Sequence, residues 1–405
     1  MRILLVNKFH WPKGGSEKYY FELGELLKKH GHEVAYFSME DEKNVMTGDK
    51  EYFVPKFDLN QGSKLKALDV IYNKENRKLM EKALDEFKPD VVHLNNFQRQ
   101  LSASIIQPCV KRNIPVVFTA HDVQAICPAI TMMDNDKNVC ELCMGGKYTN
   151  CIKKCCNKGS KLKSVLGAVE GYYYRSKNIY TKKIDYIITP SEFYRGKFIQ
   201  DGVNENKIEA IHNSIEMNDY NIETLDEGYA LYFGRLSKEK GILNLIDAFV
   251  KTKSKGLLYI AGEGPEKETI ENIIKENKLE DRVKLLGFLN KEQMTDVTRK
   301  CRFVVVPSIW YENCPYSVLE TLAIGKPVIG ANIGGIPELV NHNDNGFIYD
   351  TVEELTSYMD KLFEDDDLFN KYCAESKRLA ETLYSRDGYY EKLMRIYNDV
   401  LKERK

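Results

Sequence analysis

Short runs of β-branched and other apolar residues alternate with amphipathic segments along most of the chain, and this alternation restricts the fold more than any other feature. The runs are "RILLVN", "HEVAYFS", "DVVHLN", "PVVFTA" and "IDYIITP" in the first half, and "YALYFG", "LLYIAG", "VKLLGF", "RFVVVP" and "PVIGA" in the second. Strands that alternate with helices form parallel sheets from βα units. The pattern therefore predicts an α/β fold of two doubly wound, Rossmann-like parallel-sheet domains that face a cleft.

The boundary between the two domains is predicted within residues 211–228, because that stretch is polar and lacks periodicity. A chain of 405 residues is long enough for each domain to bury its own core. We expect an N-terminal domain over 1–212, a C-terminal domain over 213–385, and a final amphipathic helix over 386–405 that follows a break at Gly388. Binding residues are expected in the loops that follow the strands.

Composition excludes several classes of protein. The net charge is −1, so the chain has no overall cationic excess for binding nucleic acid. The segment "MRILLVNKFHWPKGG" is typical of a first strand and lacks the cleavage site of a signal peptide. No stretch approaches the roughly 20 apolar residues of a membrane span. We expect a cytoplasmic protein whose ten cysteines are thiols or metal ligands.

The segment "YENCPYSVLETLAIGKPVIG", residues 311–330, contains a predicted helix. Pro315 suits the first turn of a helix, because its missing N–H costs nothing there. Gly325 suits the position that ends a helix. The helix is therefore predicted from about Pro315 to Ile324.

Two glutamates lie near the start of this helix. Glu312 precedes the helix and Glu320 lies about one and a half turns into it, with the amides of Tyr316 and Ser317 between them. A helix N-terminus attracts anions, so a phosphate could bind there with a sugar hydroxyl on either side. The alternative is that both carboxylates are simply solvated.

Two cations follow the first strand of the second domain in "YFGRLSKEKG". Arg235 and Lys240 are five residues apart in a predicted strand-to-helix turn, so both can reach one diphosphate. The alternative is a solvated turn rich in Lys and Glu.

Glycines mark two further loops. In "AGEGPEKETI", Gly262, Glu263 and Gly264 would let the backbone approach a ligand closely. In "NKFHWPKGGSEKYY", Gly14 and Gly15 lie between the first strand and the first helix, where we expect an anion nest. By itself, each glycine pattern is weak evidence.

One histidine lies where a strand of the first domain ends. In "FTAHDVQAICP", His121 and Asp122 follow the fourth predicted strand. A single histidine is more often structural than chemical, but its place at a strand end favours function.

Taken together, these segments resemble the family 4 retaining glycosyltransferases, which have the GT-B fold. The resemblance covers most of the chain and rests on "PKGGSEKYYFELGELLKKHGHEV", "HDVQAICP", "PSEFYRGKFIQDGV", "YFGRLSKEKGILNLIDAF", "AGEGPEKETI", "VKLLGFLNKEQM" and "PSIWYENCPYSVLETLAIGKPVIGANIGGIPELV". The Glu-x7-Glu motif together with the Arg/Lys turn is its most specific part.

The resemblance implies a role for each candidate residue. Glu312 would bind hydroxyls of the donor sugar and Glu320 the ribose, while the amides of Tyr316 and Ser317 receive the sugar and the diphosphate. The diphosphate would be neutralised as it leaves by Arg235 and Lys240. His121 would lie against the transferred sugar, Gly15 would cap the phosphates, and the final helix would cross back to the first domain.

The implied reaction moves a sugar from a UDP- or GDP-sugar to a glycan or polyprenyl-pyrophosphate-linked acceptor in surface polysaccharide synthesis. It retains the anomeric configuration by front-face attack, without a protein nucleophile or a catalytic metal. The Asp-Asn-Asp at 134–136 is expected not to bind a catalytic metal, because it lies in an irregular loop. The alternatives are a sugar-nucleotide epimerase of similar fold and a non-catalytic nucleotide-sugar-binding subunit.

Six of the ten cysteines crowd into residues 127–156. Their paired spacing is typical of a structural zinc site with four thiolate ligands. The predicted ligands are Cys140, Cys143, Cys151 and Cys156, with Cys127 and Cys155 as substitutes. The loop also resembles an insertion in some polysaccharide-assembling members of the family. The alternative is a set of unligated thiols.

The stretch from Lys147 to Lys183 is strongly basic. It has ten Lys or Arg and one acid, Glu170, and tyrosines are interleaved among them. We predict a basic helix over 160–183 that binds an anionic membrane surface at the inner face of the cell membrane. The alternatives are a solvated basic face and, as the least favoured, a site for single-stranded nucleic acid.

Overall fold

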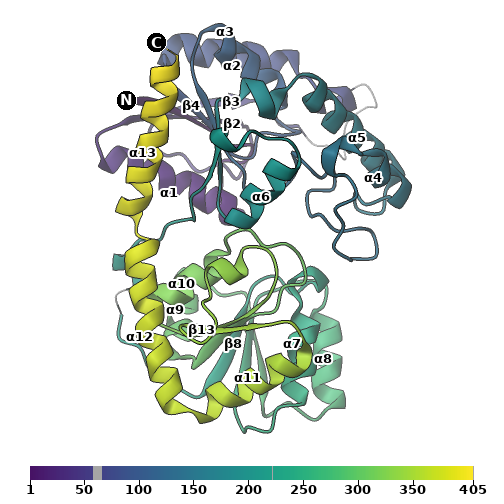
Figure 1. Cartoon of the computed structure of the whole chain (residues 1–405), viewed down its shortest axis with the longest axis vertical. Helices are drawn as coiled ribbons and strands as arrows, with labels where there is room; N and C mark the ends of the chain where they lie inside the picture. Colours follow the sequence, from purple (N-terminus) through teal and green to yellow (C-terminus); the bar gives the residue numbers. More distant parts are fainter. Residues whose placement is uncertain (58–65, 221, 405) are drawn as a thin grey trace. The chain divides into compact units, whose positions relative to one another are not determined.

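The computed structural model describes residues 1–57, 66–220 and 222–404, which form two compact units (Figure 1). The first unit comprises Met1–His212 and Tyr389–Lys405, and the second comprises Asn213–Gly388. The chain therefore leaves the first unit once and returns to it in its last helix.

A seven-stranded parallel sheet, in the order β3-β2-β1-β4-β5-β6-β7, forms the centre of the first unit. Its strands are β1 (Arg2–Val6), β2 (Glu33–Met39), β3 (Lys50–Val54), β4 (Val91–Leu94), β5 (Val116–Thr119), β6 (Tyr186–Thr189) and β7 (Ile208–Ala210). The sequence pattern does not predict β3 and β7, because these edge strands are short and only partly apolar. The strand order reverses between β1 and β4, where open parallel sheets bind their ligands.

The first unit also contains α1 (Gly15–Lys29), α2 (Lys74–Phe87), α3 (Ile106–Lys111), α4 (Thr149–Lys154), α5 (Lys161–Ser176) and α6 (Glu192–Gln200). The Ser160 hydroxyl caps α5 by accepting the amide of Lys163. The prediction of one basic helix over 160–183 is wrong, because α5 ends at Ser176. Asn178 then takes a left-handed conformation with φ of 53°, and a separate π-helical segment, η4 (Ile179–Lys183), follows.

A six-stranded parallel sheet, in the order β10-β9-β8-β11-β12-β13, forms the centre of the second unit. Its strands are β8 (Tyr229–Phe233), β9 (Leu257–Ala261), β10 (Val283–Gly287), β11 (Phe303–Val306), β12 (Val328–Ala331) and β13 (Gly346–Tyr349). Its helices are α7 (Ile242–Val250), α8 (Lys267–Glu276), α9 (Lys291–Lys300), α10 (Tyr316–Ile324), α11 (Val352–Glu364) and α12 (Asp366–Leu383). Only β13 is missing from the sequence prediction for this unit.

Both faces of the second sheet are covered, as the apolar runs of its strands require. Along β8, Ala230 and Tyr232 belong to one buried cluster, whereas Tyr229 and Leu231 belong to another. Successive strand residues point to opposite faces, so the two clusters lie on the two sides of the sheet. The carboxyl ends of the strands are therefore left for the loops.

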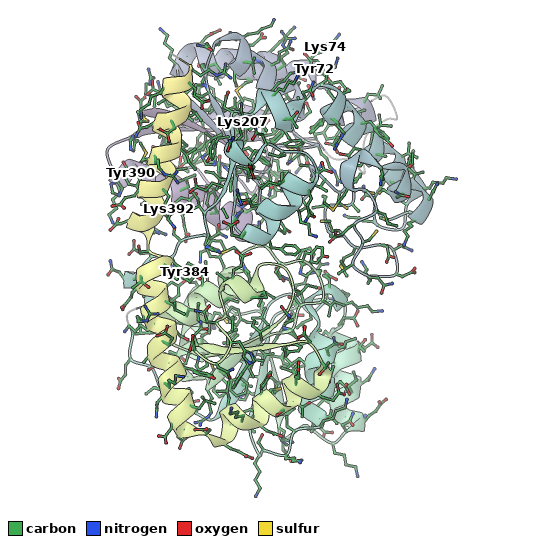
Figure 2. The ribbon with its side chains drawn as sticks, viewed as in Figure 1. Tyr72, Lys74, Lys207, Tyr384, Tyr390 and Lys392 are labelled. Atoms are coloured by element: carbon green, nitrogen blue, oxygen red, sulfur yellow. The ribbon has the colours of Figure 1, made fainter. Side chains whose placement is uncertain are left out.

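The last helix, α13 (Arg386–Glu403), joins the first unit through tyrosines. Tyr397 hydrogen-bonds His93 Nδ1 at 2.6 Å, and Tyr390, which Figure 2 labels on α13, hydrogen-bonds His32 Nε2 at 2.7 Å. The predicted break at Gly388 is wrong, because the helix runs through it. Its amide lies in the first turn, where it donates to Ser385 Oγ at 3.3 Å.

Among the described residues, no helix is long and apolar enough to cross a membrane.

Candidate functional site

Four loops meet at the carboxyl edge of the second sheet, after β8, β9, β11 and β12. Backbone hydrogen bonds join them in pairs: Leu236 N to Glu263 O at 3.0 Å, Ile309 N to Glu239 O at 3.0 Å, and Gly335 N to Glu312 O at 2.8 Å. Because each loop is fixed by its neighbour, side chains from distant parts of the sequence are held at one edge.

Two glycines make this close approach possible. Gly241 has a φ of 68°, and a Cβ there would lie 1.6 Å from the carbonyl oxygen of Pro307. Gly262 has a φ of 138°, and a Cβ there would lie 1.9 Å from the carbonyl oxygen of Gly234. No side chain fits either position, so both loops depend on glycine.

Glu312 is the centre of this edge, and its side chain is buried. Its Oε1 accepts hydrogen bonds from Lys240 Nζ at 2.6 Å, Ser308 Oγ at 2.7 Å and Trp310 Nε1 at 2.8 Å. The Lys240 ammonium also lies 5.2 Å from the centre of the Trp310 ring. The Glu312 carboxylate is thus an ionised hydrogen-bond acceptor with a fixed orientation in the loop after β11.

The charge of Glu312 results from two opposed effects. Burial raises its pKa, but the nearby Lys240 cation and the hydrogen bonds from Lys240, Ser308 and Trp310 outweigh burial and hold the pKa below its ordinary value. The carboxylate is therefore ionised at neutral pH and can accept hydrogen bonds from hydroxyl groups.

Sequence reasoning finds Glu312 and Lys240 but misses Ser308 and Trp310. Both precede Glu312 in "PSIWYE", directly after the buried strand β11. A strand-end position is a usable signal for such residues. It does not reveal that the two side chains turn toward one carboxylate.

Helix α10 begins beside Glu312, one residue later than predicted. Pro315 is its N-cap and gives no side-chain hydrogen bond to the first amides, while Gly325 ends the helix with a φ of 82°. Tyr316, Ser317 and Glu320 are all partly exposed. The N-cap residue thus gives the start of α10 no side-chain hydrogen bond, and the N-terminus of a helix favours anions.

Two further predicted residues of this edge, Arg235 and Glu263, are exposed, whereas Gly262 and Gly264 are half-buried. The guanidinium of Arg235 forms no hydrogen bond or ion pair within the described chain, and its carbonyl accepts from Tyr232 Oη at 2.8 Å. The Glu263 carboxylate pairs with Lys267 at 3.1 Å on the neighbouring turn. Arg235 is thus available to an anion, whereas the Glu263 side chain already has a partner.

In the first unit, His121 follows β5 at the corresponding edge of the sheet. Its Nε2 lies 2.9 Å from Asn95 Oδ1, and its ring meets the Tyr19 ring edge-on at 4.6 Å between centroids. The Asn95 amide nitrogen donates to the carbonyl of Val6 at 3.3 Å, which leaves Oδ1 as the acceptor. His121 Nε2 must therefore carry the proton.

The imidazole of His121 is uncharged at neutral pH. Burial lowers its pKa to about 3. His121 can accept or donate hydrogen bonds in this state, but it does not exchange protons near pH 7. Sequence reasoning places His121 at a strand end but misses Asn95, which lies one residue beyond β4.

The start of α1 differs from the nest that we expected. Gly14 is extended, with a φ of −172°, and neither Gly14 nor Gly15 has a positive φ. The buried carboxylate of Glu17 lies close by, accepting from Ser16 Oγ at 3.1 Å and Asn7 Nδ2 at 3.3 Å. An acid already occupies the first turn, so this helix start is less suited to a phosphate than a start without a carboxylate.

The predicted zinc site is not supported. Across residues 1–57, 66–220 and 222–404, no group of three or more His, Cys, Asp or Glu side chains is arranged to hold a metal ion. Cys143 and Cys151 instead pack with Tyr148 and Ala168 in a small apolar cluster, and burial raises the pKa of each thiol to about 12. Cys140 and Cys156, the other predicted ligands, are partly exposed free thiols.

Asp134, in the Asp-Asn-Asp segment, has a structural role. Its carboxylate pairs with Lys154 at 3.0 Å and accepts the amides of Asp136 and Asn138, each at 3.0 Å. These contacts fix the turn of the cysteine-containing loop.

Comparison with protein families assigns both halves of the chain. The profile described as Glycosyltransferase Family 4 matches residues 13–219, about half of the chain. The profile described as Glycosyl transferases group 1 matches residues 216–379.

Individual proteins resemble the chain at lower identity. A 42.6 kDa protein in the cps region of Klebsiella pneumoniae is 26% identical over 377 residues, which cover 88% of this chain and 92% of that protein. The N-acetylgalactosamine-N,N'-diacetylbacillosaminyl-diphospho-undecaprenol 4-alpha-N-acetylgalactosaminyltransferase of Campylobacter jejuni is 28% identical over 208 residues, 49% of this chain and 56% of that protein.

Among solved structures, Anabaena HepE in complex with UDP superposes with a TM-score of 0.73 at 18% identity, over 98% of this chain and 100% of that one. The same protein in complex with UDP-glucose gives a TM-score of 0.68. At this identity the likeness concerns the fold.

Proposed function

We propose, from the premise that this chain belongs to Glycosyltransferase Family 4 and is a glycosyltransferase with the GT-B fold, that it transfers a sugar from a UDP- or GDP-sugar to a glycan or a polyprenyl-pyrophosphate-linked acceptor. The transfer retains the anomeric configuration, needs no catalytic metal, and serves surface polysaccharide synthesis at the inner face of the cell membrane. The diphospho-undecaprenol in the name of the Campylobacter relative supports the acceptor class, and the UDP complex of HepE supports the donor class.

The observation that carries the proposal is the contact between Lys240, in the loop after β8, and Glu312, in the loop after β11. The carboxylate is buried, ionised and held by three donors, so it can bind sugar hydroxyls in a fixed orientation. Glu320 is assigned to the ribose, and the amides of Tyr316 and Ser317 to the sugar and the diphosphate.

Two cations are assigned to the leaving group. Negative charge grows on the diphosphate as the bond between the donor sugar and the diphosphate breaks. Fixed cations therefore stabilise the transition state more than they stabilise the bound donor. Arg235 has its guanidinium available, and Lys240 is fixed by Glu312. Together they can supply the countercharge without a metal ion.

The neutral His121 is assigned to the transferred sugar as a hydrogen-bonding group. With Nε2 protonated toward Asn95, Nδ1 is the unprotonated ring nitrogen and can act only as a hydrogen-bond acceptor. Gly14, Gly15, Gly262, Glu263 and Gly264 are assigned to donor binding through their backbone. No residue is assigned as a covalent nucleophile.

Thermal unfolding with nucleotides tests the donor assignment. The wild type, Glu320→Ala and a control, Glu271→Ala on the exposed face of α8, are melted with millimolar UDP, GDP, ADP and CMP. A nucleotide at 100 times its Kd stabilises the folded state by about 2.7 kcal/mol, which moves Tm by a few degrees.

We expect one diphosphate to raise Tm of the wild type and the control, and Glu320→Ala to abolish the increase. If no nucleotide raises Tm, the donor assignment fails. If UDP or GDP binds but no labelled sugar moves to a lipid-linked or glycan acceptor, the chain is a non-catalytic nucleotide-sugar-binding subunit and not an enzyme.

A further inference from the structure

The outer face of α5 has an unusual composition. Six of the twelve large apolar side chains that are exposed in the described part of the chain lie between residues 139 and 172. Four of them, on α5, form what we name the α5 stripe: Leu162, Val165, Val169 and Tyr172, which are 73%, 36%, 44% and 42% exposed. With about 100° between successive helical residues, the four lie within an arc of about 80°.

The buried face of the same helix has a composition opposite to that of the buried face of an ordinary surface helix. Its buried residues are mostly small or polar: Ser164, Gly167, Ala168, Glu170 and Tyr174. A surface helix normally turns its apolar side chains inward. Here Leu162, Val165 and Val169 point outward, and their exposure is explained if this face has another partner.

The charges around the α5 stripe are cationic. Glu170, the single acid between Lys147 and Lys183, is 3% exposed, and it points inward to the amides of Arg99 and Gln124. Lys153, Lys158 and Lys161 are exposed and form no ion pair within the described chain. Figure 1 shows that α4, which ends beside these lysines, lies next to α5.

We propose that the α5 stripe and its lysines form a docking surface for an anionic lipid bilayer, into which the four apolar side chains insert. An apolar band with an aromatic residue, flanked by cations and without an exposed acid between Lys147 and Lys183, matches the boundary between acyl chains and anionic head groups. A second copy of this chain would bring the same cations together, so charge opposes it. The inference deepens the proposed function by naming the surface that meets the membrane, and it adds insertion to electrostatic attraction.

Vesicle co-sedimentation of the full chain tests the surface. One set of vesicles contains phosphatidylcholine alone, and the other contains phosphatidylcholine and phosphatidylglycerol in equal parts, at about 0.1 M salt. The stripe variant is Leu162→Gln with Val169→Gln. Its control is Leu383→Gln, an equally apolar, 58% exposed position in the second unit. The charge variant is Lys158→Gln with Lys161→Gln.

We expect the wild type and the control to bind the anionic vesicles and to bind phosphatidylcholine far less. The stripe variant should lose about tenfold in partitioning, because two side chains no longer gain from insertion. The charge variant should also lose several-fold, and that loss should vanish at high salt. All variants should melt like the wild type, because the changed side chains are exposed.

Three results would overturn the inference: no binding of the wild type to anionic vesicles, wild-type binding by the stripe variant, or equal binding to both vesicle types. Self-association in sedimentation velocity that the stripe variant abolishes would assign the surface to a second copy instead. Thermal unfolding with nucleotides on the same preparations tests the donor assignment separately from the membrane surface, because donor binding in solution does not require α5.

Discussion

The two candidate sites occupy the same edge of two similar sheets, yet they hold their central groups in opposite charge states. In the second unit, Glu312 is buried but ionised, because Lys240 and two further donors contact its carboxylate. In the first unit, His121 is half-buried and neutral, and its Nε2 hydrogen-bonds an uncharged amide, Asn95. Burial alone removes a charge, whereas burial beside an opposite charge preserves it.

In the proposed function, the difference gives each unit a separate task in addition to the sugar contacts of Glu312. The second unit has fixed charge and exposed Arg235, which suits a phosphate-bearing leaving group. The first unit has neutral hydrogen-bonding groups, which suit sugar hydroxyls.

Removing either cation of the second unit should have the largest effect. Arg235→Ala and Lys240→Ala should each lower kcat by roughly 100-fold or more, because the leaving diphosphate loses a countercharge. Initial rates with saturating donor give the comparison. Lys267→Ala is the control, since this exposed lysine only pairs with Glu263. Turnover near the wild-type rate in both variants would remove the cations from the mechanism.

The neutral histidine predicts how stability responds to acid. The folded chain holds the pKa of His121 at about 3, against an ordinary value of 6.5, so below pH 6.5 only the unfolded chain takes up this proton. Stability should fall as pH drops from 6.5, by up to about 1.4 kcal/mol per pH unit for this group.

His121→Asn should therefore show a shallower loss of stability than the wild type in urea titrations between about pH 6.5 and about pH 4.5. His342→Asn, in the second unit, serves as the control. Because the pKa of Glu312 is held below its ordinary value of 4.5, its contribution to stability is present throughout that range and is lost only at lower pH. Parallel pH curves for His121→Asn and the wild type would contradict the assignment of a neutral imidazole.

Asn95 should matter for turnover through His121. Asn95→Ala removes the acceptor that fixes Nε2 as the protonated nitrogen, so we expect kcat to fall about tenfold with little change in the nucleotide-dependent rise of Tm. Asn95→Asp should raise the pKa of His121 and introduce a pH dependence of kcat. A pH profile of Asn95→Asp identical to that of the wild type would show that Asn95 has only a structural role.

The smallest effect is expected at α13. Tyr397→Phe removes the hydrogen bond to His93, which is fully buried, and should lower the free energy of unfolding by about 1 kcal/mol. Tyr390→Phe should cost less, because its bond to His32 is partly exposed. Urea denaturation measures both, and an equal cost for the two variants would argue against the role of burial.

Most of the architecture is visible in the sequence because buried parallel strands are continuous apolar runs. Ten strands are found this way. The edge strands β3 and β7 are not predicted, because each is an edge strand whose short sequence mixes apolar and charged residues. Strand β13 escapes because it contributes only "GFIY" after a polar turn.

The residues of the candidate site also divide into those that the sequence predicts and those that it misses. Glu312, Lys240 and His121 follow predicted strands and are therefore found, but their partners Ser308, Trp310 and Asn95 depend on how loops fold in three dimensions. The cysteine loop shows the opposite error. Its spacing suggests zinc, whereas Cys143 and Cys151 pack as protonated thiols in an apolar cluster. Spacing reports neighbours along the chain, and it does not report burial.

The return of the chain to the first unit has a consequence for biosynthesis. Residues 1–212 emerge from the ribosome first, but the hydrogen bonds of Tyr389 to Tyr19 and of Tyr397 to His93 cannot form until α13 has been made. The second unit is continuous from Asn213 to Gly388, so all of its residues are synthesised before the first unit receives its last helix. The domain whose synthesis begins first is thus the one completed last, and a nascent chain stalled after Gly388 would expose the face that α13 covers.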